Sequence, residues 1–141
     1  MLNLTATASI QISATSAAVW DALTNPTQIA NYLFGTRTTT TWQPGSPITF
    51  EGEFQGQPYL DKGMVQECNP EQSLSYTYWS GFSGLEDIPE NYSLVTYTMK
   101  GVENGILLTV SQTGFANEDG QKHSIHAWEN ILQQIKTMLE T

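Results

Sequence analysis

The hydrophobic positions of the chain alternate near its start and recur at helical spacing near its end. Over residues 4–12 every even position is apolar and every odd position is threonine, serine or glutamine, which predicts a half-buried strand. Over residues 118–140 the apolar positions are three or four residues apart, so they form one stripe along a long helix: Ile125, Trp128, Leu132, Ile135 and Leu139. Asn117 is a suitable cap for that helix.

Two short helices are expected after the first strand. Thr15 or Ser16 can cap the first helix, which carries apolar residues on one side and stops before Asn25-Pro26. Pro26 can open the second helix, because proline is well tolerated at a first helical position.

The middle of the chain reads as short strands separated by turns. Runs rich in β-branched or alternating apolar residues occupy 36–42, 48–54, 59–68, 73–79, 93–100 and 106–112, and 80–91 is the longest loop. Such evenly spaced strands favour an antiparallel meander. The pattern therefore predicts one α+β domain over residues 1–141, in which a curved antiparallel sheet of about seven strands wraps around the C-terminal helix.

The concave face of such a sheet must be covered, and the long helix is the element that can do so. The side chains expected to face it are unusually aromatic, and they either interlock as solid core or leave a cavity; composition does not decide between the two. The candidate cavity residues are Trp42, Phe50, Phe54, Tyr76, Tyr78, Tyr97, Met99, Trp128 and Leu132.

Two polar residues are also candidates for the cavity. Alternation places Glu67 on the face of Val65, and Gln112 on the face of Val110, where they could orient the polar end of a ligand. The alternative for Glu67 is a position in water at the end of its strand, since carboxylates are seldom fully buried.

The net charge of the chain limits the kinds of molecule that it is expected to bind. The 141 residues carry a formal net charge of −9, which repels phosphate backbones and anionic lipid, so we expect neither nucleic acid nor membrane as a partner. Cys68 is the sole cysteine and excludes an internal disulfide. The first residues lack the basic start and apolar run of a signal peptide, which favours a cytoplasmic protein.

No catalytic or metal-binding constellation stands out. His123 and His126 could share a metal, but they project away from the apolar stripe and no third ligand is signalled, so we expect no metal and no cofactor. Catalysis would need a titratable group facing the cavity, and Glu67 is the one candidate.

Four stretches carry a resemblance to a known family. They are the helix AVWDALTNP at 18–26, the strand pair that begins KGMVQE at 62 and closes LSYTYW at 79, the hairpin that contains GILLTV at 105–110, and the helix that begins AWENILQQIK at 127. In this order they are similar to the START-like, or helix-grip, superfamily, and more narrowly to the family named for the activator of the 90-kDa heat-shock protein ATPase.

The resemblance implies a fold and ranks three functions. It implies strand, two short helices, six antiparallel strands and a long helix, with a hydrophobic ligand held between sheet and helix. We therefore expect a small-molecule binding protein first, a chaperone accessory acting through protein contacts second, and a cyclase- or hydrolase-like enzyme third. Chaperone contact has weak support, because the negative charge leaves little basic surface. A homodimer paired through the threonine-rich edge at 36–41 is a further option.

Overall fold

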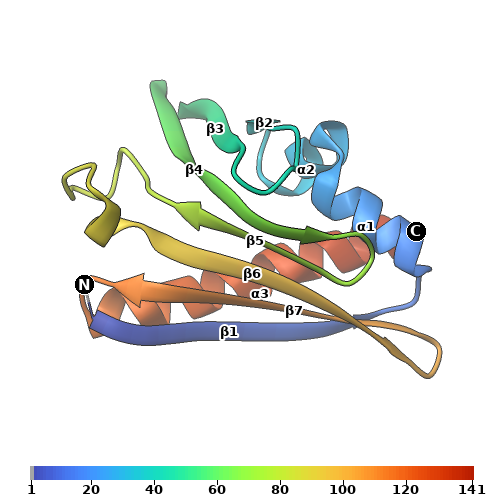
Figure 1. Ribbon diagram of the computed structural model, residues 1–141. Helices are drawn as coiled ribbons and strands as arrows, with labels where there is room; N and C mark the ends of the chain where they lie inside the picture. Colours follow the sequence, from blue (N-terminus) through green and yellow to red (C-terminus); the bar gives the residue numbers. More distant parts are fainter. Residues whose placement is uncertain (1) are drawn as a thin grey trace.

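Seven antiparallel strands form one curved sheet, and a long helix packs across one of its faces (Figure 1). The computed structural model describes residues 2–141. The strand order is β1-β7-β6-β5-β4-β3-β2, so sequence neighbours pair except at β1, which lies beside β7. The elements are β1 (Leu2–Ile12), α1 (Ser16–Thr24), α2 (Pro26–Tyr32), β2 (Arg37–Thr39), β3 (Pro47–Phe54), β4 (Gln57–Asn69), β5 (Ser73–Tyr78), the 3₁₀ turn η1 (Pro89–Asn91), β6 (Ser93–Val102), β7 (Gly105–Phe115) and α3 (Glu118–Glu140). The predicted helix-grip architecture is confirmed.

The short helices begin where their capping residues predict. The Thr15 hydroxyl accepts a hydrogen bond from the backbone N–H of Ala18 at 3.1 Å, which selects Thr15 over Ser16 as the cap. Asn25 ends α1 and caps α2, its side chain accepting from the N–H of Thr27 at 3.0 Å, and Pro26 opens α2. The two helices cover one end of the sheet (Figure 1).

The long helix is fixed at its start and along its length. Asn117 caps it by accepting from the N–H of Gly120 at 2.8 Å, so the helix begins directly after this residue despite the glycine in its first turn. Two α3 side chains donate to backbone carbonyls of β1: Gln121 to Thr5 at 2.8 Å and Lys136 to Gln11 at 2.8 Å. These bonds tie the helix to an edge strand of the sheet.

Two predicted strand limits were wrong, and left-handed backbone lies near both. The run 36–42 forms strand at Arg37–Thr39 alone, and at its end Trp42 has a φ of 63°, which is outside the extended region. Strands β3 and β4 pair as far as Phe54 and Gln57, so a tight two-residue turn replaces the expected turn at 56–58. Gln55 and Gly56 form that turn with φ values of 51° and 79°, as a type I′ turn requires.

A bulge in β4 corrects the orientation of Glu67. Val65 pairs with Tyr76, whereas Glu67 pairs with Ser75, so one extra residue interrupts the alternation between them. Glu67 therefore does not share a face with the buried Val65, and its side chain is exposed. Glu67 therefore lies in solvent, as the alternative interpretation of its sequence position predicted.

Gly63 marks a close approach of β4 to β5. A side-chain carbon placed on Gly63 would lie 1.6 Å from the carbonyl oxygen of Thr77, far inside van der Waals contact. Only glycine fits there, because its lack of a Cβ lets the two backbones meet. The close contact of the two backbones at Gly63 therefore fixes the position of β4 relative to β5.

Candidate functional site: a cavity between the sheet and the long helix

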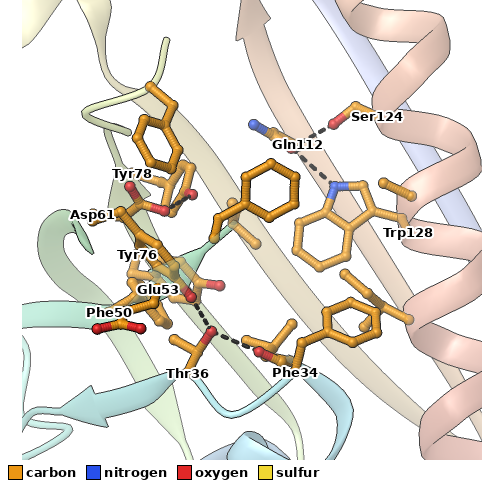
Figure 2. A pocket seen from close by; sticks show the side chains of 17 residues that line it. Phe34, Thr36, Phe50, Glu53, Asp61, Tyr76, Tyr78, Gln112, Ser124 and Trp128 are labelled. Carbon is orange, nitrogen blue, oxygen red and sulfur yellow. Dashed lines mark hydrogen bonds between the residues drawn. The ribbon is translucent and has the colours of Figure 1, made fainter. Parts of the chain in front are cut away.

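A cavity of about 510 Å³ lies between the sheet and α3, and it is partly open to solvent. Strands contribute one wall and the helix the other, as Figure 2 shows for Tyr76 and Tyr78 opposite Trp128. Most of the lining is apolar or aromatic, and it consists of Leu33, Phe34, Thr36, Phe50, Glu53, Phe54, Tyr59, Asp61, Tyr76, Tyr78, Phe82, Val95, Gln112, Ser124, Ala127, Trp128 and Ile131.

Aromatic rings that contact one another build the sheet-side wall. The ring of Phe50 lies 5.6 Å from that of Tyr76 and 5.9 Å from that of Tyr78, in tilted and edge-on arrangements that aromatic pairs prefer. Phe50 and Tyr76 are buried, so these rings belong to the core as well as to the cavity. Their packing fixes the wall and leaves an aromatic surface for a guest.

Three phenylalanines form the rim of the opening: Phe34, Phe54 and Phe82. Their exposed fractions are 79%, 59% and 57%, which is high for so apolar a side chain. Phe34 also has a φ of 54°, a left-handed conformation that costs a non-glycine residue energy. The rim therefore exposes aromatic side chains to solvent, and one of them, Phe34, has a strained backbone conformation.

Gln112 joins three elements at one end of the cavity. Its Oε1 accepts hydrogen bonds from the Trp128 Nε1 and the Ser124 hydroxyl, both at 2.9 Å (Figure 2). Its Nε2 donates to the Ser93 hydroxyl at 3.0 Å. The amide thus connects β7 to α3 and to β6. Because its oxygen already accepts two bonds, Gln112 acts mainly as a brace that orients the Trp128 indole.

Asp61 brings a carboxylate into the cavity wall. Its side chain is only 8% exposed, and its Oδ2 accepts a hydrogen bond of 2.5 Å from the Tyr78 hydroxyl (Figure 2). Its other oxygen, Oδ1, is buried and has no hydrogen-bond partner. Buried polar atoms are almost always paired, so this oxygen is an exception that calls for an explanation.

A second polar cluster lies on the opposite side of the opening from the helix. The Thr36 hydroxyl donates to the Leu33 carbonyl at 2.6 Å and contacts the Tyr59 hydroxyl at 2.5 Å. Since the one proton of Thr36 is directed to a carbonyl, Tyr59 is the donor in the second bond. This cluster is satisfied within the protein.

Burial keeps the cavity tyrosines protonated. Desolvation is the main reason that the pKa of Tyr76 and that of Tyr78 lie well above the ordinary 10.0, and the nearby Asp61 raises the pKa of Tyr78 further. Tyr78 is therefore a hydrogen-bond donor to Asp61 at neutral pH. The charged residues of the lining, Glu53 and Asp61, are both acidic.

The structure brings together six of the eleven residues proposed from the sequence. They line the cavity: Phe50, Phe54, Tyr76, Tyr78, Gln112 and Trp128. Tyr97 and Leu132 face inward but lie in the core behind the lining, where the Tyr97 ring packs edge-on at 5.9 Å against Trp128. Met99 packs against the core outside the lining.

The remaining two lie elsewhere. Trp42 packs against the core and donates from its Nε1 to the Thr24 carbonyl of α1 at 2.9 Å, a position that its left-handed backbone sets. Glu67 is exposed on the other side of the bulge. The one acid that supported a catalytic role is therefore directed away from the cavity.

Several lining residues were not predicted from the sequence. Asp61 is the most important of them, because it places a buried carboxylate in the cavity wall. Alternation counted backwards from the buried Val65 passes through Gly63 to Asp61 and Tyr59, all before the bulge. That count would have placed both side chains inward. The rim residues Phe34 and Phe82 lie in connections, where periodicity carries no information.

No metal site or membrane-spanning helix is found in the part of the chain that the structure describes. Within residues 2–141, no three histidine, cysteine or acidic side chains gather closely enough to hold an ion. His123 and His126 are exposed on α3, and His126 Nδ1 lies 3.5 Å from Glu129 Oε1. None of the helices over the same residues is both long enough and apolar enough to cross a bilayer.

Comparison with known proteins decides the family. The family model described as Activator of Hsp90 ATPase homolog 1-like protein matches residues 13–140. The chain belongs to this family. A solved protein of Cytophaga hutchinsonii, ChR145, is similar to this chain over nearly its whole length, with 37% identity, coverage of 99% of this chain and 97% of that one, and a TM-score of 0.86. No curated protein matches the sequence.

Two more distant structures share the fold of this chain. A Mesorhizobium loti protein is 21% identical, with coverage of 97% of both chains and a TM-score of 0.81. The Aha1 dimer of Colwellia psychrerythraea is 17% identical, with coverage of 97% and 96% and a TM-score of 0.76. At these identities the likeness concerns the fold, which is that of the START-like superfamily, whose members commonly bind hydrophobic ligands.

Proposed function

We propose that this chain binds a small apolar or aromatic molecule in the cavity between the sheet and α3. The observation that carries the proposal is the cavity itself, whose 510 Å³ falls within the usual range for ligand sites. Its walls offer ring faces from Phe50, Tyr76 and Trp128, and a few polar groups at fixed positions. Membership of a superfamily that commonly binds hydrophobic ligands supports the same function.

The packing of the molecule adds a physical reason. Protein interiors are close-packed, and a void loses the contacts that would otherwise stabilise its lining. The exposed rim of Phe34, Phe54 and Phe82 leaves further apolar surface in water. A bound guest would cover both surfaces, so the free energy lost to the void and the rim would be recovered on binding.

Native mass spectrometry of gently purified protein, followed by a thermal-shift screen of sterols, aromatics and apolar amines, alcohols and acids, tests the proposal. A guest selective for the folded state raises the midpoint by mass action. Ala127 lines the opening yet is exposed on α3, so Ala127→Trp should block the cavity without disturbing the core. Asn130→Trp, on an exposed position of the same helix, is the matched control.

The two variants separate cavity binding from surface adhesion. A midpoint shift that survives in Asn130→Trp and is lost in Ala127→Trp supports the proposal. No bound molecule and no shift from any compound, or an equal shift in both variants, would contradict it.

Family membership favours one second candidate, an accessory role at a chaperone ATPase. This role would act through protein contacts and would not need the cavity. Addition of the chain to a purified 90-kDa heat-shock protein tests it by the rate of ATP hydrolysis, with the Ala127→Trp variant beside it. An unchanged rate would exclude a direct activating role, and equal stimulation by both proteins would separate that role from ligand binding.

Pairing of two copies through the threonine-rich segment remains a prediction, and we propose it as a test of assembly. That segment does supply an edge strand, β2, but the strand is three residues long. Arg37 and Glu51 form an exposed ion pair of 3.1 Å beside it. Light scattering at high protein concentration tests the assembly, and a monomer would exclude it.

A further inference from the structure

Asp61 is unusual because half of its carboxylate is satisfied and half is not. Tyr78 donates to Oδ2, while Oδ1 is buried without a partner. A buried acceptor that lacks a donor destabilises the protein that contains it, which is why such atoms are rare. Asp61 also lies in the cavity wall, so a molecule inside the cavity is the nearest source of the missing donor.

No basic side chain from the neighbouring strands fills that role. Lys62 follows Asp61 in β4 and so projects from the opposite face, where its Nζ lies 2.5 Å from a carboxylate oxygen of Asp87. Arg37, on β2, is paired with Glu51. The cavity lining holds no cationic residue, and its other charged residue, Glu53, is an acid at the rim.

The unpartnered oxygen can be turned towards a guest. It is shielded from water in the present arrangement, but the terminal torsion of an aspartate is soft and has no sharp staggered minima. A small rotation about that bond turns Oδ1 towards the cavity while the Tyr78 hydroxyl keeps its hydrogen bond to the carboxylate. Binding then gives the unsatisfied acceptor a hydrogen bond.

We infer that the cavity selects molecules that join an apolar body to a hydrogen-bond-donating head, a hydroxyl or an amine, and that Asp61 receives this donor. The aromatic walls hold the body, and the carboxylate accepts from the head. An apolar acid is disfavoured, because its carboxylate would face Asp61 and Glu53 with no cation between them. This inference rests on the proposed function and narrows its ligand class.

Four naphthalene probes of matched shape test the inference by calorimetric titration: 2-naphthylmethylamine, 2-naphthylmethanol, 2-methylnaphthalene and 2-naphthoate. The amine and the alcohol should each bind at least about tenfold more tightly than 2-methylnaphthalene, as expected for a hydrogen bond to a buried charged acceptor. The naphthoate should bind more weakly than 2-methylnaphthalene. Shifts of the Trp128 indole N–H signal in NMR spectra locate the bound probe in the cavity.

Variants assign the selectivity to Asp61. Asp61→Asn removes the charge at constant shape, and the amine should lose most of its advantage. Asp61→Leu removes the acceptor as well, and the alcohol should then lose its advantage too. Glu103→Gln removes the same charge from an exposed turn outside the cavity and is the matched control, with an expected change below about threefold because solvent screens it.

The outcomes separate this inference from the proposed function. Equal binding of all four probes by the unaltered protein, tighter binding of the naphthoate than of the alcohol, or an undiminished preference for the amine in Asp61→Asn would overturn the inference and leave cavity binding in place. Failure of every probe, 2-methylnaphthalene included, would overturn both. The comparison among probes uses the unaltered protein, so it stands even if Asp61→Leu does not fold.

Discussion

The indole Nε1 of Trp128 donates a hydrogen bond of 2.9 Å to Oε1 of Gln112, and this bond connects the middle of α3 to β7. Ser124, one turn earlier on the helix, donates to the same oxygen. The bonds thus fix both the amide and the indole that faces the cavity. Together with the bonds from Gln121 and Lys136 to β1, this polar pairing gives the helix a defined position along the sheet.

Replacement of Gln112 by leucine should destabilise the protein by about 1–3 kcal/mol, because it leaves half-buried donors without an acceptor. The measurement is the free energy of unfolding in urea. Gln133→Leu, at an exposed position of α3, is the matched control and should change stability by less than about 0.5 kcal/mol. Equal effects of the two substitutions would contradict the role of Gln112 as a brace.

Gly63→Ala should be severely destabilising. The added carbon would meet the Thr77 carbonyl oxygen at 1.6 Å, so β4 and β5 would have to separate, at a cost of several kcal/mol. Gly101→Ala, in β6, is the control, because its new carbon would meet nothing within 4 Å. Urea unfolding of both variants provides the comparison, and a stable Gly63→Ala protein would show that the two strands are not held at this distance.

Alkaline pH should destabilise the fold through its buried tyrosines. Burial is the first cause that raises the pKa of Tyr32, Tyr76, Tyr78 and Tyr97 above the ordinary 10.0. Above pH 10 the unfolded chain releases these protons while the folded protein retains them, so the free energy of unfolding falls as pH rises. It should be constant with respect to these groups below that pH.

Tyr97→Phe tests this linkage. Each such tyrosine contributes up to about 1.4 kcal/mol per pH unit, and the variant should therefore lose stability less steeply above pH 10 by about that amount. The measurement is the urea midpoint at a series of pH values, with absorbance at tyrosinate wavelengths as a second readout. Parallel curves for the two proteins would refute it.

Phe34→Asn should separate binding from stability. Asparagine tolerates the left-handed backbone that Phe34 adopts, and the ring is largely exposed, so the free energy of unfolding should be unchanged or higher. Loss of the rim ring should nevertheless weaken the binding of 2-methylnaphthalene several-fold. Phe34→Ala removes the same ring without the backbone preference; if it binds the probe as tightly as the unaltered protein, the rim takes no part.

The sequence predicted the fold well because the fold depends on periodicity. Alternation in β1 and the apolar stripe of α3 both survive in the structure, Thr15 and Asn117 cap helices as expected, and α1 ends before Asn25-Pro26 as expected. Such signals are local, so they need no knowledge of what packs against them.

The site was predicted only in part, because it depends on interruptions of that periodicity. One bulge turned Glu67 outward, and Trp42, whose own backbone is left-handed, packs towards α1 and not into the cavity. Neither has a sequence signature that alternation can detect. Asp61 could have been found by counting back from Val65, whereas its unpartnered oxygen follows from three-dimensional packing alone.

The walls and the rim of the cavity come from different parts of the chain. The rate at which a guest exchanges and the affinity with which it binds therefore depend mainly on different residues. Strands and α3 supply the walls, while Phe34, Phe54 and Phe82 come from the α2–β2 connection, the end of β3 and the β5–β6 loop. Loops move within nanoseconds to microseconds, so a guest can pass the rim without lifting the helix from the sheet. The rates at which a guest enters and leaves are then set at the rim, whereas most of its affinity comes from the walls and a smaller part from the rim rings.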